Sequence, residues 1–414
     1  MRLQTVLGLS LATAAVCAAS AADWPQWQGP NRDNISTEKG LLQAWPKEGP
    51  PLAWKATELG AGYSGVSVAR GKIFTIGDCG DSAFVEALAF DTGKKLWEAK
   101  LGQAGGGGGY PGPRATPAVD GDFVYALGQY GDLACLRVAD GKEVWRKSLK
   151  ADFGGRMMSG WGYAESPLVD GKLLLCTPGG AQGTVCALDK ATGAVRWRST
   201  DFTDAASYAS LVAVDFGGVH QAIVLTDAHV AGIAIDSGKL LWSAPRVGKT
   251  AVVPTPVFKD GRVFVTSGYG IGCNLFKVEG GGAQFTANEV YTNKDMINHH
   301  GGVVLVDKHL YGFSDGGKGW SCLDFATGAV ASQWQGGIGK GTLTRADGRF
   351  YLRAEGGPGT LVLMDATPDG WKEAGRFDPP DRSTKNSWPH LVISNGRLFV
   401  RDQDVLLCYN IQAR

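Results

Sequence analysis

A short sequence pattern recurs along most of the chain, and it limits the fold more than any other feature. In its clearest copy, residues 187–197, Leu188 leads into a tight turn that ends at Gly193, and Trp197 follows four residues later. Further copies lie at residues 87–97, 135–145, 232–242 and 322–334. Self-similarity at a period of roughly 45 residues is typical of solenoids and propellers, in which each repeat is one supersecondary unit.

Each copy has the features of a β-hairpin. An apolar strand runs into a turn, and Gly93, Gly141 or Gly193 supplies the positive φ that such a turn requires. The next strand carries a Trp at a fixed distance, and one Trp side chain can bury roughly 150–250 Å². We therefore predict that this ring packs between neighbouring repeats.

The number of repeats predicts the number of blades. The closing aromatic residues are Trp97, Trp145, Trp197, Trp242, Tyr291, Trp334 and Phe377. Residues 387–414 then supply three strands without a closing one, and the strand around Trp54 has no repeat before it. Together these ends complete an eighth sheet, and closing the ring hides free sheet edges. We predict an all-β fold, an eight-bladed β-propeller of four-stranded antiparallel blades, closed by an N-terminal strand that joins the last blade. Seven blades is the alternative, because Tyr291 and Phe377 depart from the repeat.

The N-terminus has the pattern of a secretory signal. In residues 1–22 Arg2 is the only charged residue, an apolar core follows it, and small residues precede Asp23. The apolar stretch is too short to span a membrane. Lipidation at Cys17 is an alternative that its neighbour Val16 fits poorly. We predict a signal peptide cleaved before Asp23 and a periplasmic or secreted protein.

The mature chain divides into two parts. Residues 23–51 are rich in Trp, Pro and Gly without a helical or strand period, so we predict an extended N-terminal arm, and residues 52–414 are the propeller. The chain has 41 basic and 40 acidic residues, and removal of the signal leaves 40 of each. This balance argues against nucleic acid as a partner. No later segment is apolar and long enough to be transmembrane.

Seven of the eight cysteines follow the signal, so at least one is unpaired within the chain. Cys135 and Cys322 stand at the small-residue position of the repeat, and we expect them to be buried packing residues. Cys176 and Cys186 lie on two strands of one predicted hairpin. A disulfide between them is a hypothesis.

Beyond the repeat, several stretches resemble a known family. They are residues 23–33 (DWPQWQGPNRD), 161–171 (WGYAESPLVDG), 298–302 (NHHGG) and 401–409 (RDQDVLLCY). With these stretches the chain resembles exported bacterial propellers with pyrroloquinoline-quinone-like (PQQ-like) repeats, over nearly the whole mature sequence. That superfamily contains quinoprotein alcohol dehydrogenases and non-enzymatic scaffolds, among them the propeller lipoprotein of outer-membrane assembly. The resemblance therefore implies the fold and leaves the activity open.

The loops that lead into the first strand of each blade should surround the propeller axis, where ligands usually bind. The candidate ligand-binding residues there are Arg114, Glu165, Tyr208, Asn298, His299, His300, Lys340 and Trp388. The same loops carry Tyr63, Ser64, Thr116, Tyr163 and His390. Convergent polar groups with aromatic walls suit a small anionic or polyhydroxylated ligand. The alternative is that these residues are solvated loop ends.

His299 and His300 are adjacent, so in a strand they would point to opposite faces. One could face the axis as a metal ligand or general base, and the alternative is a hydrogen-bonded structural histidine. Because no third ligand stands at a suitable spacing, we predict no metal site.

We interpret the chain as an exported binding or scaffold module whose partner is an envelope protein, a glycan or a small polar ligand. The alternative is a PQQ-dependent alcohol or sugar dehydrogenase with the quinone and calcium over the axis. In that family a vicinal disulfide covers the quinone, and this chain has no adjacent cysteine pair. A hydrolase or lyase acting through Glu165 and the two histidines is a third class. An enzyme should bring Arg114, Glu165 and a histidine into one deep pocket, whereas a scaffold should carry an apolar patch on a blade rim or face.

Overall fold

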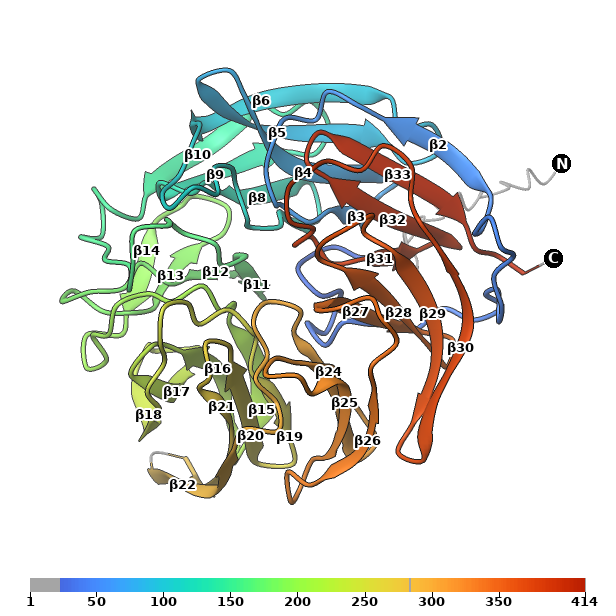
Figure 1. Ribbon diagram of the computed structural model, residues 1–414. Helices are drawn as coiled ribbons and strands as arrows, with labels where there is room; N and C mark the ends of the chain where they lie inside the picture. Colours follow the sequence, from blue (N-terminus) through green and yellow to red (C-terminus); the bar gives the residue numbers. More distant parts are fainter. Residues whose placement is uncertain (1–22, 283, 414) are drawn as a thin grey trace, which may run out of the picture.

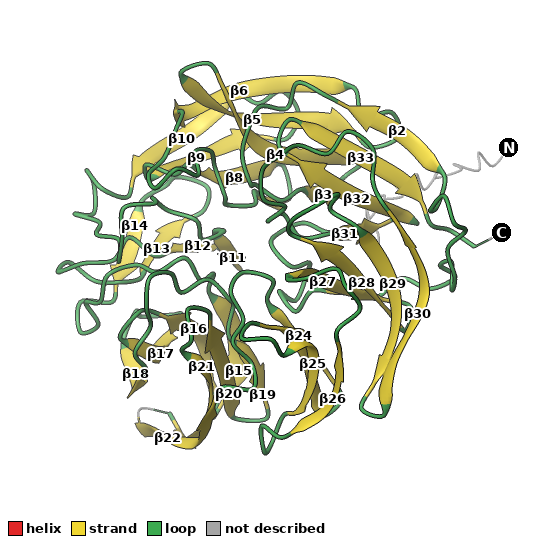
Figure 2. Cartoon of the chain, viewed as in Figure 1, coloured by secondary structure: helices red, strands yellow, loops and turns green. Residues whose placement is uncertain are grey.

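The computed structural model describes residues 23–282 and 284–413, whose regular elements are 33 strands and no helix (Figure 2). Residues 1–22, with the predicted signal peptide and Cys17, lie outside the described residues. Accordingly, nothing in the described ranges forms a helix that could cross a membrane.

Apart from β1, the strands form eight antiparallel blades, numbered here along the chain. Blade 1 contains β3 (Ser67–Ala69), β4 (Lys72–Cys79), β5 (Ser82–Ala89) and β6 (Lys95–Gln103), and blade 2 contains β7 (Ala118–Asp120), β8 (Phe123–Leu127), β9 (Asp132–Arg137) and β10 (Glu143–Ser148). Blade 3 contains β11 (Leu168–Asp170), β12 (Leu173–Cys176), β13 (Cys186–Asp189) and β14 (Val195–Arg198), and blade 4 contains β15 (Val212–Phe216), β16 (Val219–Leu225), β17 (His229–Ala234) and β18 (Leu240–Pro245). Blade 5 contains β19 (Val257–Lys259), β20 (Arg262–Ser267), β21 (Gly272–Gly281) and β22 (Gln284–Asn293), and blade 6 contains β23 (Val303–Val306), β24 (His309–Ser314), β25 (Gly319–Asp324) and β26 (Val330–Trp334). Blade 7 contains β27 (Gly341–Ala346), β28 (Arg349–Ala354), β29 (Leu361–Thr367) and β30 (Gly370–Phe377), and blade 8 contains β31 (Val392–Ser394), β32 (Arg397–Asp402), β33 (Val405–Asn410) and β2 (Leu52–Ala56).

The blades form a closed ring, and β2 joins blade 8 at its outer edge (Figure 1). In that pairing Trp54 lies opposite Cys408, and Lys55 lies opposite Leu407. The predicted eight-bladed propeller and its closure by an N-terminal strand are therefore confirmed. Blade 7 has one additional strand, because β1 (Ile35–Ser36) pairs in parallel with its inner strand β27.

The recurring Trp and Gly residues join neighbouring blades. Trp97 of blade 1 lies against Gly141 in the corresponding turn of blade 2, and its Nε1 donates a hydrogen bond to the carbonyl oxygen of Val138 at 3.1 Å. The same contact recurs in the pairs Trp54–Gly93, Trp145–Gly193, Trp197–Gly238 and Tyr291–Gly328. Tyr291 replaces Trp because its hydroxyl also reaches a carbonyl oxygen of the next blade, that of Phe325, at 3.1 Å. The ring therefore packs between repeats, as the sequence predicted.

The cysteines that the repeat assigned to packing are indeed buried. Cys135 and Cys322 are fully buried within hydrophobic clusters. Cys176 and Cys186 lie opposite each other on β12 and β13, but both are free thiols. The hypothesis of a disulfide is therefore wrong for this structure, in which the Cys176 thiol donates instead to the Cys186 carbonyl oxygen.

The segment after Asp23 crosses the centre of the ring. Trp24 forms a β-bridge with Val68 of blade 1, and the Pro25 carbonyl oxygen accepts a hydrogen bond from Val119 of blade 2. Further along, Trp27 donates to Thr255 before blade 5. A segment this short touches widely separated blades only if it lies on the propeller axis. Residues 23–36 thus form an axial plug, and the chain then runs outward to β2.

Arg32 is a buried charged residue of the axial plug. It is 4% exposed, and its guanidinium donates to the carbonyl oxygens of Ser166, Pro167 and Leu211, which belong to the segments leading into blades 3 and 4. Burial lowers the pKa of Arg32 to about 9, while the Glu165 carboxylate acts in the opposite direction. Asn34 reaches the other side of the ring, where it contacts the Leu343 carbonyl oxygen and the His390 ring. The axial plug therefore links opposite blades.

The contact between Trp97 and Gly141 predicts a position-specific sensitivity. An added Cβ at Gly141 would lie 2.6 Å from Trp97 Cε3, whereas at Gly121 of the same blade it would meet nothing within 4 Å. Both glycines have positive φ, so the backbone strain of alanine is shared. We expect Gly141→Ala to lower the free energy of unfolding by about 1–3 kcal/mol more than Gly121→Ala does, measured by urea denaturation. Equal losses in the two variants would contradict the proposed blade–blade contact.

Loss of the Arg32 guanidinium should destabilise the whole ring. Arg32→Gln leaves several buried carbonyl oxygens without their donor and removes the positive charge that acts on Glu165, changes that together cost about 3–5 kcal/mol. The control is Arg137→Gln, since Arg137 forms an exposed ion pair with Asp140. Exposed pairs contribute about 1 kcal/mol or less. A similar loss of unfolding free energy in both variants, measured by urea denaturation, would show that Arg32 does not hold the ring.

Candidate functional site

An axial pocket lies above the axial plug and has a volume of about 210 Å³. Every blade contributes to its wall through the segment that leads into its innermost strand, as with Tyr63 of blade 1 and Val253 of blade 5. Trp27 of the axial plug also lines the pocket. The pocket is therefore the mouth of the propeller channel, closed below by the N-terminal arm.

Aromatic rings form most of the wall. They are Trp27, Tyr63, Tyr110, Trp161, Tyr208, Tyr269 and Trp388. Trp388 is the most connected, because its ring centroid lies 4.2 Å from that of Tyr63 and 5.1 Å from that of Tyr110. The Arg114 guanidinium lies 5.7 Å from the Tyr63 ring centroid and 6.0 Å from that of Trp388. Such walls can hold an apolar ring face while a cation stays close to its edge.

A chain of polar contacts runs along one side of the pocket. His299 Nε2 lies 2.8 Å from the Tyr269 hydroxyl, and Lys340 Nζ lies 3.1 Å from both His299 Nδ1 and Glu355 Oε2. Trp388 Nε1 donates to Glu355 Oε1 at 2.8 Å. Since an ammonium group can only donate, Nδ1 is the acceptor, and the Nε2 proton points to Tyr269. Burial and the Lys340 charge lower the pKa of His299 to about 4, so the ring is neutral at neutral pH.

The His300 side chain forms no hydrogen bond within the described residues. It is 9% exposed, and neither of its ring nitrogens has a hydrogen-bond partner among the described residues. Burial lowers its pKa well below the usual value, and the nearby His299 and Lys340 act in the same direction. A neutral imidazole carries one donor and one acceptor. Both nitrogens are themselves buried, so they do not face the free space of the pocket, and His300 borders that space without offering it a hydrogen bond.

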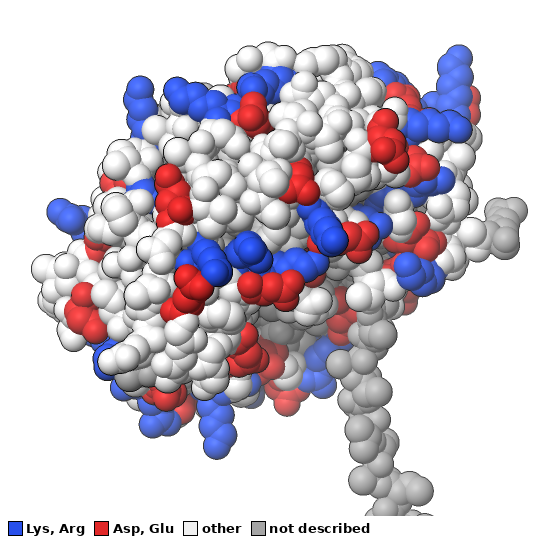
Figure 3. All heavy atoms as spheres, turned by 90° about the horizontal axis from the view of Figure 1, so that it is seen from below, with Lys and Arg blue, Asp and Glu red and all other residues white. Residues whose placement is uncertain are grey.

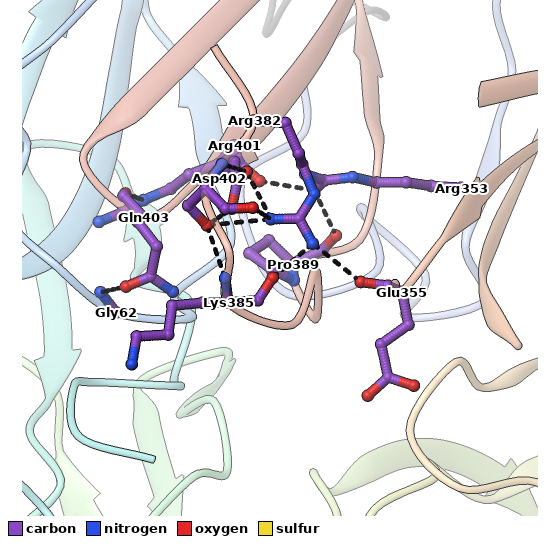
Figure 4. Close-up of polar contacts among 10 residues, drawn as sticks. Gly62, Arg353, Glu355, Arg382, Lys385, Pro389, Arg401, Asp402 and Gln403 are labelled. Carbon is purple, nitrogen blue, oxygen red and sulfur yellow. Dashed lines mark hydrogen bonds and ion pairs between the residues drawn. The ribbon is translucent and has the colours of Figure 1, made fainter. Parts of the chain in front are cut away.

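The loop that carries Trp388 is fixed by a buried ion pair (Figure 4). Arg382 Nη1 donates to Asp402 at 2.8 Å, and its Nη2 donates to the Glu355 carbonyl oxygen at 3.0 Å. Both side chains are about one-tenth exposed. The Ser383 amide also donates to Asp402, at 2.7 Å. This network positions Trp388 and leaves the Glu355 carboxylate free to face Lys340.

Comparison with known proteins agrees with this architecture. Residues 81–335, more than half of the chain, match the PQQ_2 family, described as outer membrane protein assembly factor BamB. The chain belongs to this family. It is 25% identical over 242 residues to outer membrane protein assembly factor BamB of Moranella endobia, which covers 56% of each chain. It is 33% identical over 111 residues to the protein of the same name from Xanthomonas campestris, which covers 25% of each chain. The chain thus spans about half the length of the first relative.

Solved structures extend the likeness in fold to most of the chain. BamB from Moraxella catarrhalis has a TM-score of 0.57 at 14% identity and covers 82% of this chain and 94% of its own. Quinohemoprotein alcohol dehydrogenase from Comamonas testosteroni has a TM-score of 0.51 at 11% identity and covers 95% of this chain and 81% of its own. At such identities the comparison shows the propeller fold alone. The PQQ-like repeat recognised in the sequence is confirmed.

Six of the eight candidate residues line the axial pocket: Arg114, Tyr208, His299, His300, Lys340 and Trp388. The two histidines were expected to point to opposite faces. That expectation is wrong, because residues 299–301 form a bend rather than a strand, and both rings line the pocket.

Glu165 and Asn298 do not line the pocket. Glu165 is 1% exposed, and its carboxylate accepts hydrogen bonds from the Thr177 amide and hydroxyl groups. Asn298 braces its own loop through bonds of 3.0 and 2.9 Å to the Gly302 carbonyl oxygen and amide. The arrangement of Arg114, Glu165 and a histidine in one pocket, which an enzyme would need, is therefore not formed. The hydrolase or lyase interpretation therefore lacks the Glu165 carboxyl group that it would need in the pocket.

Sequence reasoning missed several lining residues. Trp27 and Trp161 stand inside the stretches that carry the family resemblance, but their direction could not be predicted. Tyr269 and Glu355 follow the second strand of their blades rather than preceding the first, and each is followed by Gly. The sequence signal that could have identified Tyr269 and Glu355 is the glycine that directly follows each of them after the second strand of the blade.

The pocket does not suit the calcium of a quinoprotein dehydrogenase. Calcium takes 6–8 oxygen ligands, several of them carboxylates. Glu355 is the one carboxylate in the lining, and Lys340 and Trp388 already bind it. No group of three His, Cys, Asp or Glu side chains within residues 23–282 and 284–413 could hold a metal ion. The aromatic walls could stack a quinone ring, but the donor set for its metal partner is missing from the described residues.

Charged side chains of both signs alternate on the side of the molecule in Figure 3. No extended patch of one sign appears on that face. This distribution agrees with the balanced charge of the sequence.

The buried histidines predict an acid-sensitive fold. The pKa of an unfolded His is near 6.5, whereas burial lowers the pKa of folded His299 and His390 to about 4 and that of His300 well below its usual value. As pH falls from 6.5 towards 4 the unfolded state binds more protons, so the free energy of unfolding falls.

His300→Gln should flatten this fall by up to about 1.4 kcal/mol per pH unit. Urea denaturation at pH 4.5, 5.5, 6.5 and 7.5 measures it. Between pH 6.5 and 7.5 the slopes of wild type and variant should differ by only about 0.4 kcal/mol per pH unit, because the unfolded histidine is losing its last protons there, and this interval serves as the internal control. An unchanged slope below pH 6.5 would mean that His300 is not held neutral in the folded protein.

Proposed function

We propose that the protein is an exported, non-catalytic binding module of the cell envelope whose axial pocket binds a saccharide ring. The observation that carries the proposal is the combination of seven aromatic side chains with the Arg114 guanidinium and the Lys340–Glu355 ion pair around one pocket. A sugar ring offers apolar C–H faces for aromatic walls. Its hydroxyl groups both donate and accept hydrogen bonds, which suits charged donors and a carboxylate in the same wall.

The geometry around Trp388 supports a ring-shaped ligand. The indole is fixed by ring contacts with Tyr63 and Tyr110 and at its edge by Glu355, so little side-chain entropy is lost on binding. Pockets for small molecules typically combine such apolar walls with a few convergent polar groups. Arg114 and Lys340 supply those groups here.

An envelope location is supported by the family and by the predicted signal. The relatives are named as outer membrane protein assembly factors, which makes an envelope protein a plausible second class of partner. We propose a periplasmic or secreted protein, processed before Asp23. The exposed large apolar residues Leu52, Leu96, Val144, Val195 and Val330 lie on the outer strands of different blades. Because they are spread around the ring, they favour the axial pocket over the blade rim as the binding site.

A PQQ-dependent dehydrogenase is the alternative that the fold allows. The stacked rings of Tyr63 and Trp388 beside Arg114 would suit a planar, anionic quinone. The single carboxylate of the pocket, engaged by Lys340, does not suit the calcium ion that accompanies it. The site therefore supports binding better than oxidation.

Trp388 provides the direct test of the proposed pocket. The mature protein is titrated with glucose, galactose, galacturonic acid and their disaccharides while Trp fluorescence and the thermal midpoint are recorded. We expect saturable quenching by at least one sugar, and a ligand at one hundred times its Kd should add about 2.7 kcal/mol of stability. Trp388→Ala should weaken that affinity at least about tenfold because the stacking face is lost. Trp371→Ala, a Trp outside the pocket, should bind as wild type.

The same assay with PQQ distinguishes the saccharide-binding proposal from the dehydrogenase alternative. Without a calcium site, any quenching by PQQ should be the same with calcium as with a calcium chelator. Quenching that needs calcium and raises the thermal midpoint would instead favour the dehydrogenase. No response to any sugar would refute the saccharide pocket.

A further inference from the structure

A second hollow adjoins the axial pocket. This blade 6–7 groove has a volume of about 630 Å³ and is lined by residues 337–340 and 354–358, with Phe313, Asp315 and Thr360. Lys340 and Glu355 line both the groove and the axial pocket. Their ion pair, 3.1 Å long, is therefore the shared wall between the two spaces.

The groove leaves its backbone accessible. Four of its lining residues are glycines: Gly337, Gly339, Gly356 and Gly357. An added Cβ would meet nothing within 4 Å at any of them. Peptide groups without side chains offer hydrogen bonds to hydroxyl groups at close approach. A second polar ring, rather than an apolar group, suits this surface.

The charges of the combined space are unevenly placed. Lys340 is paired with Glu355, whereas Arg114 forms no ion pair within the described residues and feels only the nearby charge of Asp78. Asp315 adds a carboxylate to the groove. A ligand with one negative charge, placed at Arg114 and away from Asp315, therefore suits the site.

Arg114 has the free donors to bind that charge. Its guanidinium donates to the carbonyl oxygens of Gly112, Trp161 and Tyr110, and it forms no ion pair within the described residues. These bonds use three of five N–H groups. The remaining two can bind a carboxylate, the partner that a guanidinium fits best. Trp388 lies between Arg114 and the Lys340–Glu355 pair, since it contacts Arg114 with its face and Glu355 with its edge.

We propose that the ligand is an acidic oligosaccharide. A uronic acid ring stacks on Trp388 with its carboxylate on Arg114, and the next sugar unit lies beyond the Lys340–Glu355 pair in the blade 6–7 groove, where Asp315 requires it to be neutral. The inference rests on the saccharide pocket proposed above and adds two properties to it, a negative charge and a length of at least two units.

The test uses galacturonic acid, a dimer and a trimer in which neutral galactose units extend it, and galactose as the neutral counterpart. Affinity for the mature protein is measured by Trp fluorescence and by calorimetry. We expect galacturonic acid to bind at least tenfold more tightly than galactose in 50 mM salt, with a smaller ratio in 500 mM salt because of screening. The dimer and trimer should bind at least tenfold more tightly than the monomer.

Substitutions at two positions test the charge of the ligand and the length of the ligand separately. Arg114→Gln should abolish the preference for galacturonic acid over galactose, and Arg114→Lys, which keeps the charge but loses the fork of donors, should retain part of it. The control is Arg198→Gln, since Arg198 also lies over an aromatic ring, that of Phe153, but outside the pocket.

Gly356→Phe should fill the groove, reduce trimer affinity to that of the monomer, and leave monomer binding unchanged. Thermal midpoints establish that each variant is folded.

The outcomes distinguish the acidic-oligosaccharide ligand from the saccharide pocket on which that inference rests. Equal binding of galactose and galacturonic acid, or equal loss of both in Arg114→Gln, would overturn the acidic ligand and leave a neutral saccharide pocket standing. Equal affinity of monomer and trimer would overturn the role of the groove. If no sugar binds, both proposals fail.

Discussion

The insertion of Arg32 into the propeller axis is the interaction on which the centre of this structure depends. Eight blades arranged in a ring leave their inner segments around a channel, and backbone carbonyl oxygens there need donors. The guanidinium donates to carbonyl oxygens before blades 3 and 4, and Asn34 does the same for blade 7. Removing a charge from water is costly unless hydrogen bonds and a counter-charge compensate, and Glu165 is that counter-charge. Because Trp27 belongs to the same short segment, the plug that closes the channel also forms part of the pocket.

Burial then determines the chemistry that the pocket can perform. Burial raises the pKa of Glu165 to about 7 despite its bonds to Thr177 and the charge of Arg32, and its distance from the pocket lining leaves it a structural role. The histidines beside the channel are neutral for the same reason, since burial favours the uncharged imidazole. Positive charge remains only on Arg and Lys, whose intrinsic pKa values are high enough to withstand burial. The pocket therefore combines neutral hydrogen-bonding rings with one unbalanced guanidinium, a set suited to recognition.

The fold was predictable from the sequence because one physical constraint repeats. Each blade must meet the next, and the Trp–Gly contact solves that problem with a large ring, a turn with positive φ and a carbonyl acceptor. The period of this contact predicts the number of blades, and the unmatched ends predict the closure. The site was predictable only as far as topology places loops at the axis. Whether a loop residue points into the channel depends on local hydrogen bonds, which is why Asn298 turns back to Gly302 while His300 does not. The path of the N-terminal arm depends on its contacts with blades that are distant in the sequence. A local sequence pattern cannot predict such contacts.

The same ring serves both assembly factors and alcohol dehydrogenases, so the activity must be read from the residues at the axis rather than from the blades. Here the decisive group is Lys340. Its ammonium lies 3.1 Å from both Glu355 Oε2 and His299 Nδ1, so it neutralises the only carboxylate of the pocket and occupies the acceptor of the neighbouring imidazole. A divalent cation at Glu355 would have to displace this ammonium and would still find a single carboxylate. An organic ligand needs no such displacement, because the aromatic walls and the free donors of Arg114 are available with the Lys340–Glu355 pair intact. The electrostatics of one ion pair thus favour a propeller that binds its ligand over one that oxidises it.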